Sequence, residues 1–237
     1  MQSKLIDNNF YLGLNFNNDG TKMYTVSATD TSDAVIEHIL TTPYDISTAT
    51  VNNTKIVDRG GVTQATQVVF NNDGTKMFVV MHAGVKDIDY YSLSTAFDIS
   101  TATFDNFFDI SGQEKRANSI AFNNDGTRMI VAGAGNTEDL SSSHNYIDGV
   151  TFNYDGTKMY TIRGSEHDNK ISQFKLTTPY DVSTLSLEGT FDTSSVSADS
   201  RELVFSNDGS KMFIIDDSND KVHEFNLSCN WSVIDGA

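Results

Sequence analysis

The chain has 237 residues, of which 38% are hydrophobic and 20% are charged, so it can bury one sizeable core. Its 32 acidic and 16 basic residues give a formal net charge of −16, which repels nucleic acid phosphates and anionic membranes, so we expect neither as a partner. The single cysteine excludes an internal disulfide, and no apolar run is long enough to cross a membrane.

One nine-residue motif recurs five times along the chain. It reads FNNDGTKMY in the first copy, and its copies begin at Phe16, Phe70, Phe122, Phe152 and Phe205. The intervals between successive copies are 54, 52, 30 and 53 residues. Self-similarity at a period near fifty indicates a repeat architecture.

Each copy of the motif predicts a β-hairpin. Asp-Gly between two apolar runs favours a tight turn, because glycine takes the positive φ that the turn requires. The Asp carboxylate and the following Thr or Ser can accept hydrogen bonds from nearby backbone N–H groups. A calcium loop is the alternative for such a turn, but the closing glutamate of an EF-hand is absent, so we interpret the motif as a structural turn.

The remaining strands of each repeat follow in order. The second strands, at 23–26, 77–80, 129–132, 159–162 and 212–215, are nearly continuous apolar runs, typical of strands buried on both faces. Third strands are expected at 34–40, 87–93, 170–176 and 221–227. A second shared element, at 40–50, 93–103 and 176–186, predicts a long turn, and it carries the only two prolines. Polar fourth strands at 50–58, 103–109 and 186–192 are expected at the outside.

Four antiparallel strands per repeat, apolar inside and polar outside, predict an all-β fold, a β-propeller of five blades. We expect one domain over 1–237, with blades starting near 10, 65, 117, 147 and 201. The chain ends inside its last long turn, so the fifth repeat lacks its own fourth strand. Residues 2–7 precede the first repeat, and we expect them to form the strand that completes the last blade and closes the ring.

The 30-residue interval between Phe122 and Phe152 is too short for a full repeat. We therefore expect an incomplete, two-stranded third blade, with the residues that follow 133 as a bridge to the next repeat. Two interpretations remain open. The bridge covers the gap, or the edge at 129–132 stays open and accepts a strand from another chain, including a second copy.

The recurrent motif resembles the F-S-P-D-G-T-K signature of the WD-repeat-like and YVTN-like β-propeller families. Together with the Leu-Thr-Thr-Pro-Tyr-Asp element at 40–45, it is similar to propeller repeats found in marine bacteria and in phage structural proteins. The resemblance covers nearly the whole chain and implies the fold. Because both signatures are turn and core elements, it implies no particular activity.

Functional residues in a propeller are expected on loops where the repeats disagree. The loops between second and third strands share one face and form an acidic rim. The ligand-face candidates on this rim are Asp30, Asp33, His82, Asp87, Arg163, Glu166, His167, Asp168, Asp216, Asp217 and Asp220. Four residues before each motif phenylalanine the repeats carry Leu12, Thr66, Asn118, Asp148 and Arg201, so Asp148 and Arg201 are candidates at the mouth of the central channel.

No cofactor is expected, with Ca²⁺ as the one alternative. Oxygen-rich loops suit this ion, and Asp216, Asp217 and Asp220 are the densest acidic group. Catalysis would need residues of a shared site, and His82 and His167 with nearby acids are the only such set on this face. No residue is singled out as catalytic.

The sequence thus favours a non-enzymatic binding or structural module, such as a part of a phage tail or another extracellular surface assembly, with a protein or glycan partner. The alternatives are a propeller-type hydrolase or lyase that uses His82 and His167, and a glycan-binding propeller. Residues 2–7 lack the apolar core of a signal peptide, so an extracellular or virion-associated location would be reached by virion assembly, with a partner, or with a leader outside this sequence.

Overall fold

The computed structural model describes residues 1–6, 11–29, 32–58, 64–82, 87–114, 116–133, 146–164 and 168–234. These ranges contain eighteen β-strands and four short 3-10 helices. No helix in them is long and apolar enough to cross a membrane.

The strands form five separate antiparallel sheets, one for each repeat. Four sheets have four strands, which run in this order from the inside of the ring outward: β2 (Tyr11–Phe16), β3 (Lys22–Thr29), β4 (Ser32–Leu40) and β5 (Ala49–Ile56) in the first repeat; β6 (Ala65–Phe70), β7 (Lys76–Met81), β8 (Asp87–Leu93) and β9 (Ala102–Asp109) in the second; β12 (Gly149–Phe152), β13 (Lys158–Arg163), β14 (Lys170–Leu176) and β15 (Leu185–Asp192) in the fourth; β16 (Ser200–Phe205), β17 (Lys211–Asp216), β18 (Lys221–Asn226) and β1 (Gln2–Leu5) in the fifth. The third repeat has β10 (Ala117–Phe122) and β11 (Met129–Gly133).

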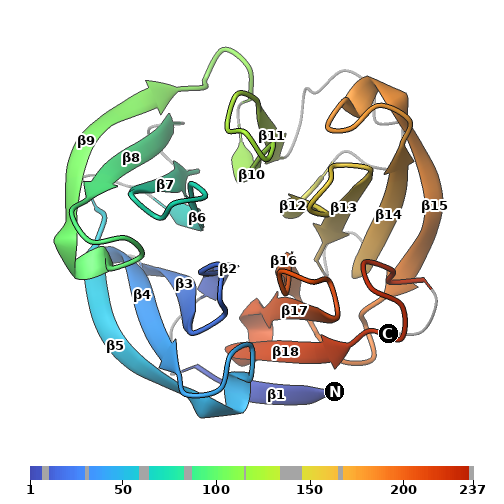
Figure 1. Cartoon of the computed structure of the whole chain (residues 1–237), viewed down its shortest axis with the longest axis horizontal. Helices are drawn as coiled ribbons and strands as arrows, with labels where there is room; N and C mark the ends of the chain where they lie inside the picture. Colours follow the sequence, from blue (N-terminus) through green and yellow to red (C-terminus); the bar gives the residue numbers. More distant parts are fainter. Residues whose placement is uncertain are drawn as a thin grey trace.

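The five sheets stand around a ring, with the first strand of each at the centre (Figure 1). This arrangement is an all-β propeller. The expected count of five blades is corrected to four complete blades, because the third repeat contributes only the sheet β10–β11 among the described residues. The physical reason is the 30-residue interval, which leaves too little chain for third and fourth strands.

The two ends of the chain meet in one blade, as the sequence predicted. Strand β1 pairs antiparallel with β18, and Gln2 lies opposite Glu224. The Gln2 side-chain amide donates to the Glu224 carboxylate at 2.6 Å, and the Ile6 N–H donates to the carbonyl of Asp220 at 2.9 Å. N-terminal residues thus supply the outermost strand of the last blade, which closes the ring.

The recurrent hairpins owe their shape to one aspartate and one glycine. In the first, the Asp19 carboxylate accepts hydrogen bonds from the backbone N–H and the hydroxyl of Thr21, at 2.9 and 2.6 Å. Gly20 has a φ of +70°, a conformation that side chains disfavour. The same contacts recur at Asp73, Asp125, Asp155 and Asp208. These hydrogen bonds lower the pKa of each aspartate, to about 2 for Asp208.

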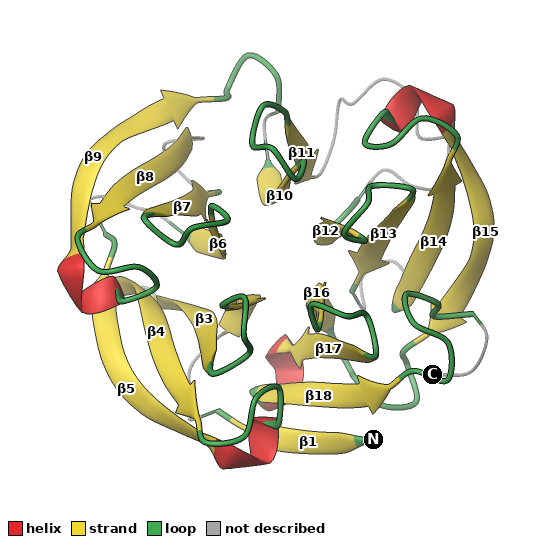
Figure 2. Ribbon diagram, viewed as in Figure 1, coloured by secondary structure: helices red, strands yellow, loops and turns green. Residues whose placement is uncertain are grey.

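The core lies between the sheets. Met23, Met77 and Met212 in the second strands are fully buried, and the fourth strands β5, β9 and β15 are largely exposed. Both findings confirm the predicted gradient from an apolar centre to a polar rim. The 3-10 helices η1 (Ile46–Thr48), η2 (Ile99–Thr101) and η3 (Val182–Thr184) lie in the long turns at this rim, and η4 (Asp217–Asn219) follows β17 (Figure 2).

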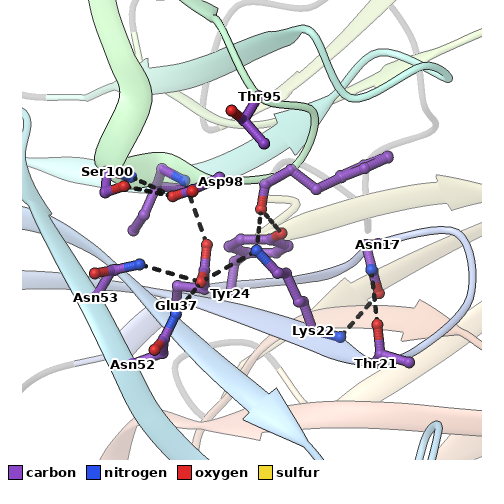
Figure 3. A network of polar contacts seen from close by, with 12 residues as sticks. Asn17, Thr21, Lys22, Tyr24, Glu37, Asn52, Asn53, Thr95, Asp98 and Ser100 are labelled. Carbon is purple, nitrogen blue, oxygen red and sulfur yellow. Dashed lines mark hydrogen bonds and ion pairs between the residues drawn. The ribbon is translucent and has the colours of Figure 1, made fainter.

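Neighbouring blades are joined by buried polar contacts as well as by apolar packing. Between the first and second repeats, Lys22 Nζ and the Tyr24 hydroxyl donate to the carbonyl of Phe97, at 2.8 and 2.6 Å (Figure 3). Glu37 pairs with Lys22 at 3.2 Å and accepts from the N–H of Ile99 at 3.3 Å. Each blade therefore holds the long turn of the next.

Candidate functional site

The structure has a polar cavity of about 410 Å³ at one end of the central channel. Its wall includes all five residues that precede the motif phenylalanines by four positions: Leu12, Thr66, Asn118, Asp148 and Arg201. The sequence placed Asp148 and Arg201 at the channel mouth, and both lie there together. His82 and Asp217 of the predicted loop candidates also line this cavity.

A β-bulge explains why these side chains reach the channel. The pairing between first and second strands skips one residue in four repeats, namely Leu12, Thr66, Asn118 and Arg201. An extra residue bends the strand and turns its side chain out of the regular alternation. In the fourth repeat Asp148 precedes β12, and its N–H donates to the carbonyl of Ile162 at 3.0 Å. One backbone device thus places one variable residue per repeat around the cavity.

Arg201 is surrounded by three carboxylates. Its Nη1 lies 3.2 Å from Asp148, its Nη2 lies 2.6 Å from Asp199, and its Nε lies 3.5 Å from Asp217. The second oxygen of Asp148 accepts from the N–H of Gly164 at 2.8 Å. One guanidinium therefore faces three acids, and the group carries excess negative charge when all three are ionised.

This excess appears in the pKa values of the acids. Burial raises the pKa of Asp217 to about 6, Arg201 opposes the rise, and the charges of Asp199 and Asp220 add to it. Burial also raises the pKa of Asp148, against the hydrogen bond from Gly164 and the charge of Arg201. The Oδ1 atom of Asp217 is buried and accepts no hydrogen bond from the described residues.

The cavity wall also carries residues of opposite charge and aromatic character. Arg116 and Tyr146 line it, and the Arg116 guanidinium lies 5.8 Å from the centre of the Tyr146 ring. His82 Nδ1 lies 3.1 Å from the carbonyl oxygen of Ala117. No hydroxyl or carboxylate of the described residues contacts the imidazole, so it belongs to no nucleophile–base pair there.

Glu202 lies beneath the cavity and does not line it. Its side chain is fully buried, and burial raises its pKa well above the ordinary value. It accepts hydrogen bonds from the Ser119 hydroxyl at 3.3 Å and the Leu203 N–H at 3.1 Å. Its role is thus to join neighbouring first strands, because the Ser119 hydroxyl in turn accepts from the N–H of Val150 at 3.0 Å.

The remaining loop candidates do not converge on the cavity. Asp33 and Asp87 are buried at the starts of third strands. Arg163 pairs with Asp168 at 2.7 Å, away from the cavity wall. The predicted candidates Asp30, Glu166 and His167 lie outside the described residues.

The acidic group proposed for Ca²⁺ does not form a shared site in the structure. Asp216 is fully buried and accepts from the backbone N–H groups of Ala198 and Asp199 and from the side chain of Asn219. The neighbouring Asp217 faces Arg201 instead. No group of three or more metal-ligating side chains occurs among the residues that the structure describes.

Sequence reasoning did not single out Arg116, Tyr146 or Asp199. Arg116 and Asp199 directly precede first strands, at Ala117 and Ser200. The signal that could have found them is therefore the polar residue just before each first strand, where the chain enters the channel mouth.

Comparisons with known proteins support the fold. The chain is similar to the Cps50 (Swd1) β-propeller domain of Myceliophteria thermophila, with a TM-score of 0.52, 9% identity, and coverage of 96% of this chain and 100% of that domain. It is also similar to a chain in a structure of the mitotic checkpoint complex, with a TM-score of 0.51, 12% identity, and coverage of 91% and 76%. A periplasmic gluconolactonase of Pseudomonas aeruginosa matches with a TM-score of 0.48 and 14% identity, over 91% of this chain and 66% of the other.

Fold and comparisons together define the chain as a β-propeller protein. No protein-family model matches it, and no curated protein matches it. The identities to solved structures are low, so the likeness concerns the fold, and the site must be interpreted from its own residues.

Proposed function

We propose that the chain is a non-enzymatic binding propeller whose channel-mouth cavity takes a positively charged group, an ammonium or a guanidinium. The observation that carries this proposal is the buried Asp217 Oδ1, which belongs to a cavity-lining residue and accepts no hydrogen bond from the described residues. A buried acceptor without a partner costs free energy, and a cationic donor from a ligand would satisfy it.

Charge balance supports the same ligand chemistry. Asp148, Asp199 and Asp217 all pair with the single guanidinium of Arg201, so the acids outnumber the cation that they share. A cation bound beside Asp217 would neutralise part of the excess and would lower the pKa of that carboxyl from about 6. Binding should therefore strengthen as pH rises through 6, because the ionised form of Asp217 is the one that attracts the ligand.

The cavity residues support binding rather than catalysis. His82 contacts a backbone carbonyl, and the buried Glu202 does not reach the cavity, so neither supplies the paired groups that hydrolysis needs. The cationic group would come from a small amine or from a lysine or arginine side chain of a partner protein. We propose an extracellular or virion-associated assembly as the setting, in which the acidic surface would favour a basic partner.

Calorimetric titration tests the proposal with two probes, agmatine for a small cation and N-acetyl-arginine-N-methylamide for a side chain of a protein. We expect saturable binding at pH 8 that weakens at pH 5, and a loss of at least about tenfold in affinity in Asp217→Asn. The control is Asp220→Asn, which changes the same loop outside the cavity wall. Stronger binding of the arginine probe would identify a protein side chain as the source.

Two results would contradict the proposal. One is the absence of heat with either probe at any pH. The other is turnover in a screen of esters and lactones that depends on His82, which would support the hydrolase alternative instead.

A further inference from the structure

Every complete blade covers the glycine of its first hairpin with an aromatic ring. The ring comes from the long turn after the third strand of the same blade. In each case a Cβ on the glycine would overlap the ring, so the aromatic side chain lies directly on the glycine Cα. The pairs are Tyr44 on Gly20, Phe97 on Gly74, Tyr180 on Gly156 and Trp231 on Gly209.

The same rings pack on the phenylalanine that opens each motif. The distances between ring centres are 5.4 Å for Tyr44 and Phe16, and 5.6 Å for Phe97 and Phe70. The corresponding pairs in the fourth and fifth repeats are 5.3 and 5.2 Å apart. The glycine and the phenylalanine therefore form a receptor for an aromatic side chain, and four copies of that receptor are filled.

The third repeat has the receptor without the ring. Gly126 has the same φ of +70°, and a Cβ there would meet nothing within 4 Å. A cavity of about 350 Å³ is present, lined by Gly126, Phe122 and Phe78 among others. Phe78 and Phe122 pack at 4.9 Å, as Tyr24 and Phe70 do at 4.4 Å one repeat earlier, so the floor of the receptor is intact.

The polar part of the receptor is also vacant. In filled copies, a lysine of the preceding blade donates to the carbonyl of the aromatic residue, as Lys22 does to Phe97 at 2.8 Å and Lys211 does to Tyr44 at 2.9 Å (Figure 3). The equivalent Lys76 precedes the third repeat. It is 42% exposed and contacts Asp105 and Ser92 of its own blade. A donor for an incoming carbonyl is thus available.

We infer that the third repeat accepts an aromatic side chain from a segment of a partner protein, which lies on Gly126 and Phe122 and offers its carbonyl to Lys76. Residues 134–145 of this chain include no aromatic residue, so they supply no ring. The aromatic residues of this chain's own long turns already cover Gly20, Gly74, Gly156 and Gly209. A partner segment is therefore the occupant that fits.

The filled copies also define the chemistry of that segment. Tyr44, Phe97, Tyr180 and Trp231 all have φ between 55° and 59°, and each follows an extended third strand. The partner should present an extended strand followed by an aromatic residue in a turn, and its strand would pair with the edge of β11. One contact differs: Tyr90 stands where Glu37 and Glu224 accept a turn N–H, so the ring and its carbonyl are the anchors.

A peptide with the sequence of residues 170–184 is the probe, because it contains a third strand and a turn with its tyrosine at 180. We expect fluorescence anisotropy to show binding of this peptide to the full chain, and at least about tenfold weaker binding when that tyrosine is replaced by alanine. Gly126→Asn should weaken binding similarly, since asparagine tolerates the positive φ and its side chain enters the receptor. Thr127→Ser, which reproduces the hairpin of the fifth repeat, is the matched control and should bind as the natural chain does.

Failure of the peptide to bind the natural chain would overturn the inference, and so would equal binding to Gly126→Asn. Sedimentation of the free chain provides a separate check. A dimer that dissociates in Gly126→Asn would overturn the inference by assigning the receptor to a second copy.

Discussion

At the residue scale, the site depends on the imbalance between Arg201 and the three acids around it. Asp148, Asp199 and Asp217 come from separate segments of the sequence, and the ring brings them to one guanidinium. Asp217 has the least compensation, because one of its oxygens is buried without a hydrogen bond from the described residues. Its ionised form is therefore costly in the folded protein.

The substitution Asp217→Asn should reveal this cost as a dependence of stability on pH. The pKa of Asp217 is about 6 when folded and near the ordinary value of 3.8 when unfolded, so the folded state binds the proton more tightly. The contribution of Asp217 to stability is then greatest below pH 4 and is lost as pH rises through 6. Urea unfolding should show that Asp217→Asn gains about 1–3 kcal/mol relative to the natural chain between pH 4 and pH 8. A difference that stays constant with pH would contradict the assigned pKa.

At the element scale, the unit of this fold is the hairpin with its aromatic cover. The Asp-Gly turn supplies the positive φ, and the ring of the long turn buries the glycine. The third repeat separates these two contributions, because Gly126 has the same φ as Gly20 and no ring above it. Comparison of the two positions therefore isolates the value of the cover.

Alanine at these glycines should have unequal effects. Gly126→Ala should cost about 1–2 kcal/mol, the usual penalty for a side chain in the left-handed region. Gly20→Ala should cost about 1–3 kcal/mol more, since its Cβ would also displace the Tyr44 ring. Chemical denaturation of both variants measures the two values. Equal losses would show that the ring contributes nothing to the stability of the hairpin.

The elements were predictable because their signals are local. The Asp-Gly turns, the continuous apolar second strands and the proline-containing turns each specify a short stretch of backbone, and their repetition specifies the propeller. The ion pairs of the site were not predictable in the same way. Asp148 and Arg201 meet only because separate repeats aim side chains at one channel, and no local pattern indicates that Asp217 faces Arg201 while Asp216 turns inward.

At the scale of the whole molecule, the cavity exists because the ring closes. Its wall takes one residue from each repeat, and the closure depends on β1, which completes the last blade beside β18 (Figure 1). The truncated third repeat interrupts the outer part of the ring and leaves the first strands around the channel in place. The same molecule thus has a complete channel mouth for a polar ligand and an incomplete rim for a partner segment.

The most direct test of the account is the titration of Asp217 in the intact protein, followed by the ¹³C NMR signal of its carboxyl group with and without agmatine. We predict a midpoint near pH 6 for the free protein and a lower midpoint in the presence of agmatine, because the bound cation favours the ionised carboxyl. A midpoint near the ordinary value for an aspartate that agmatine leaves unchanged would contradict the account.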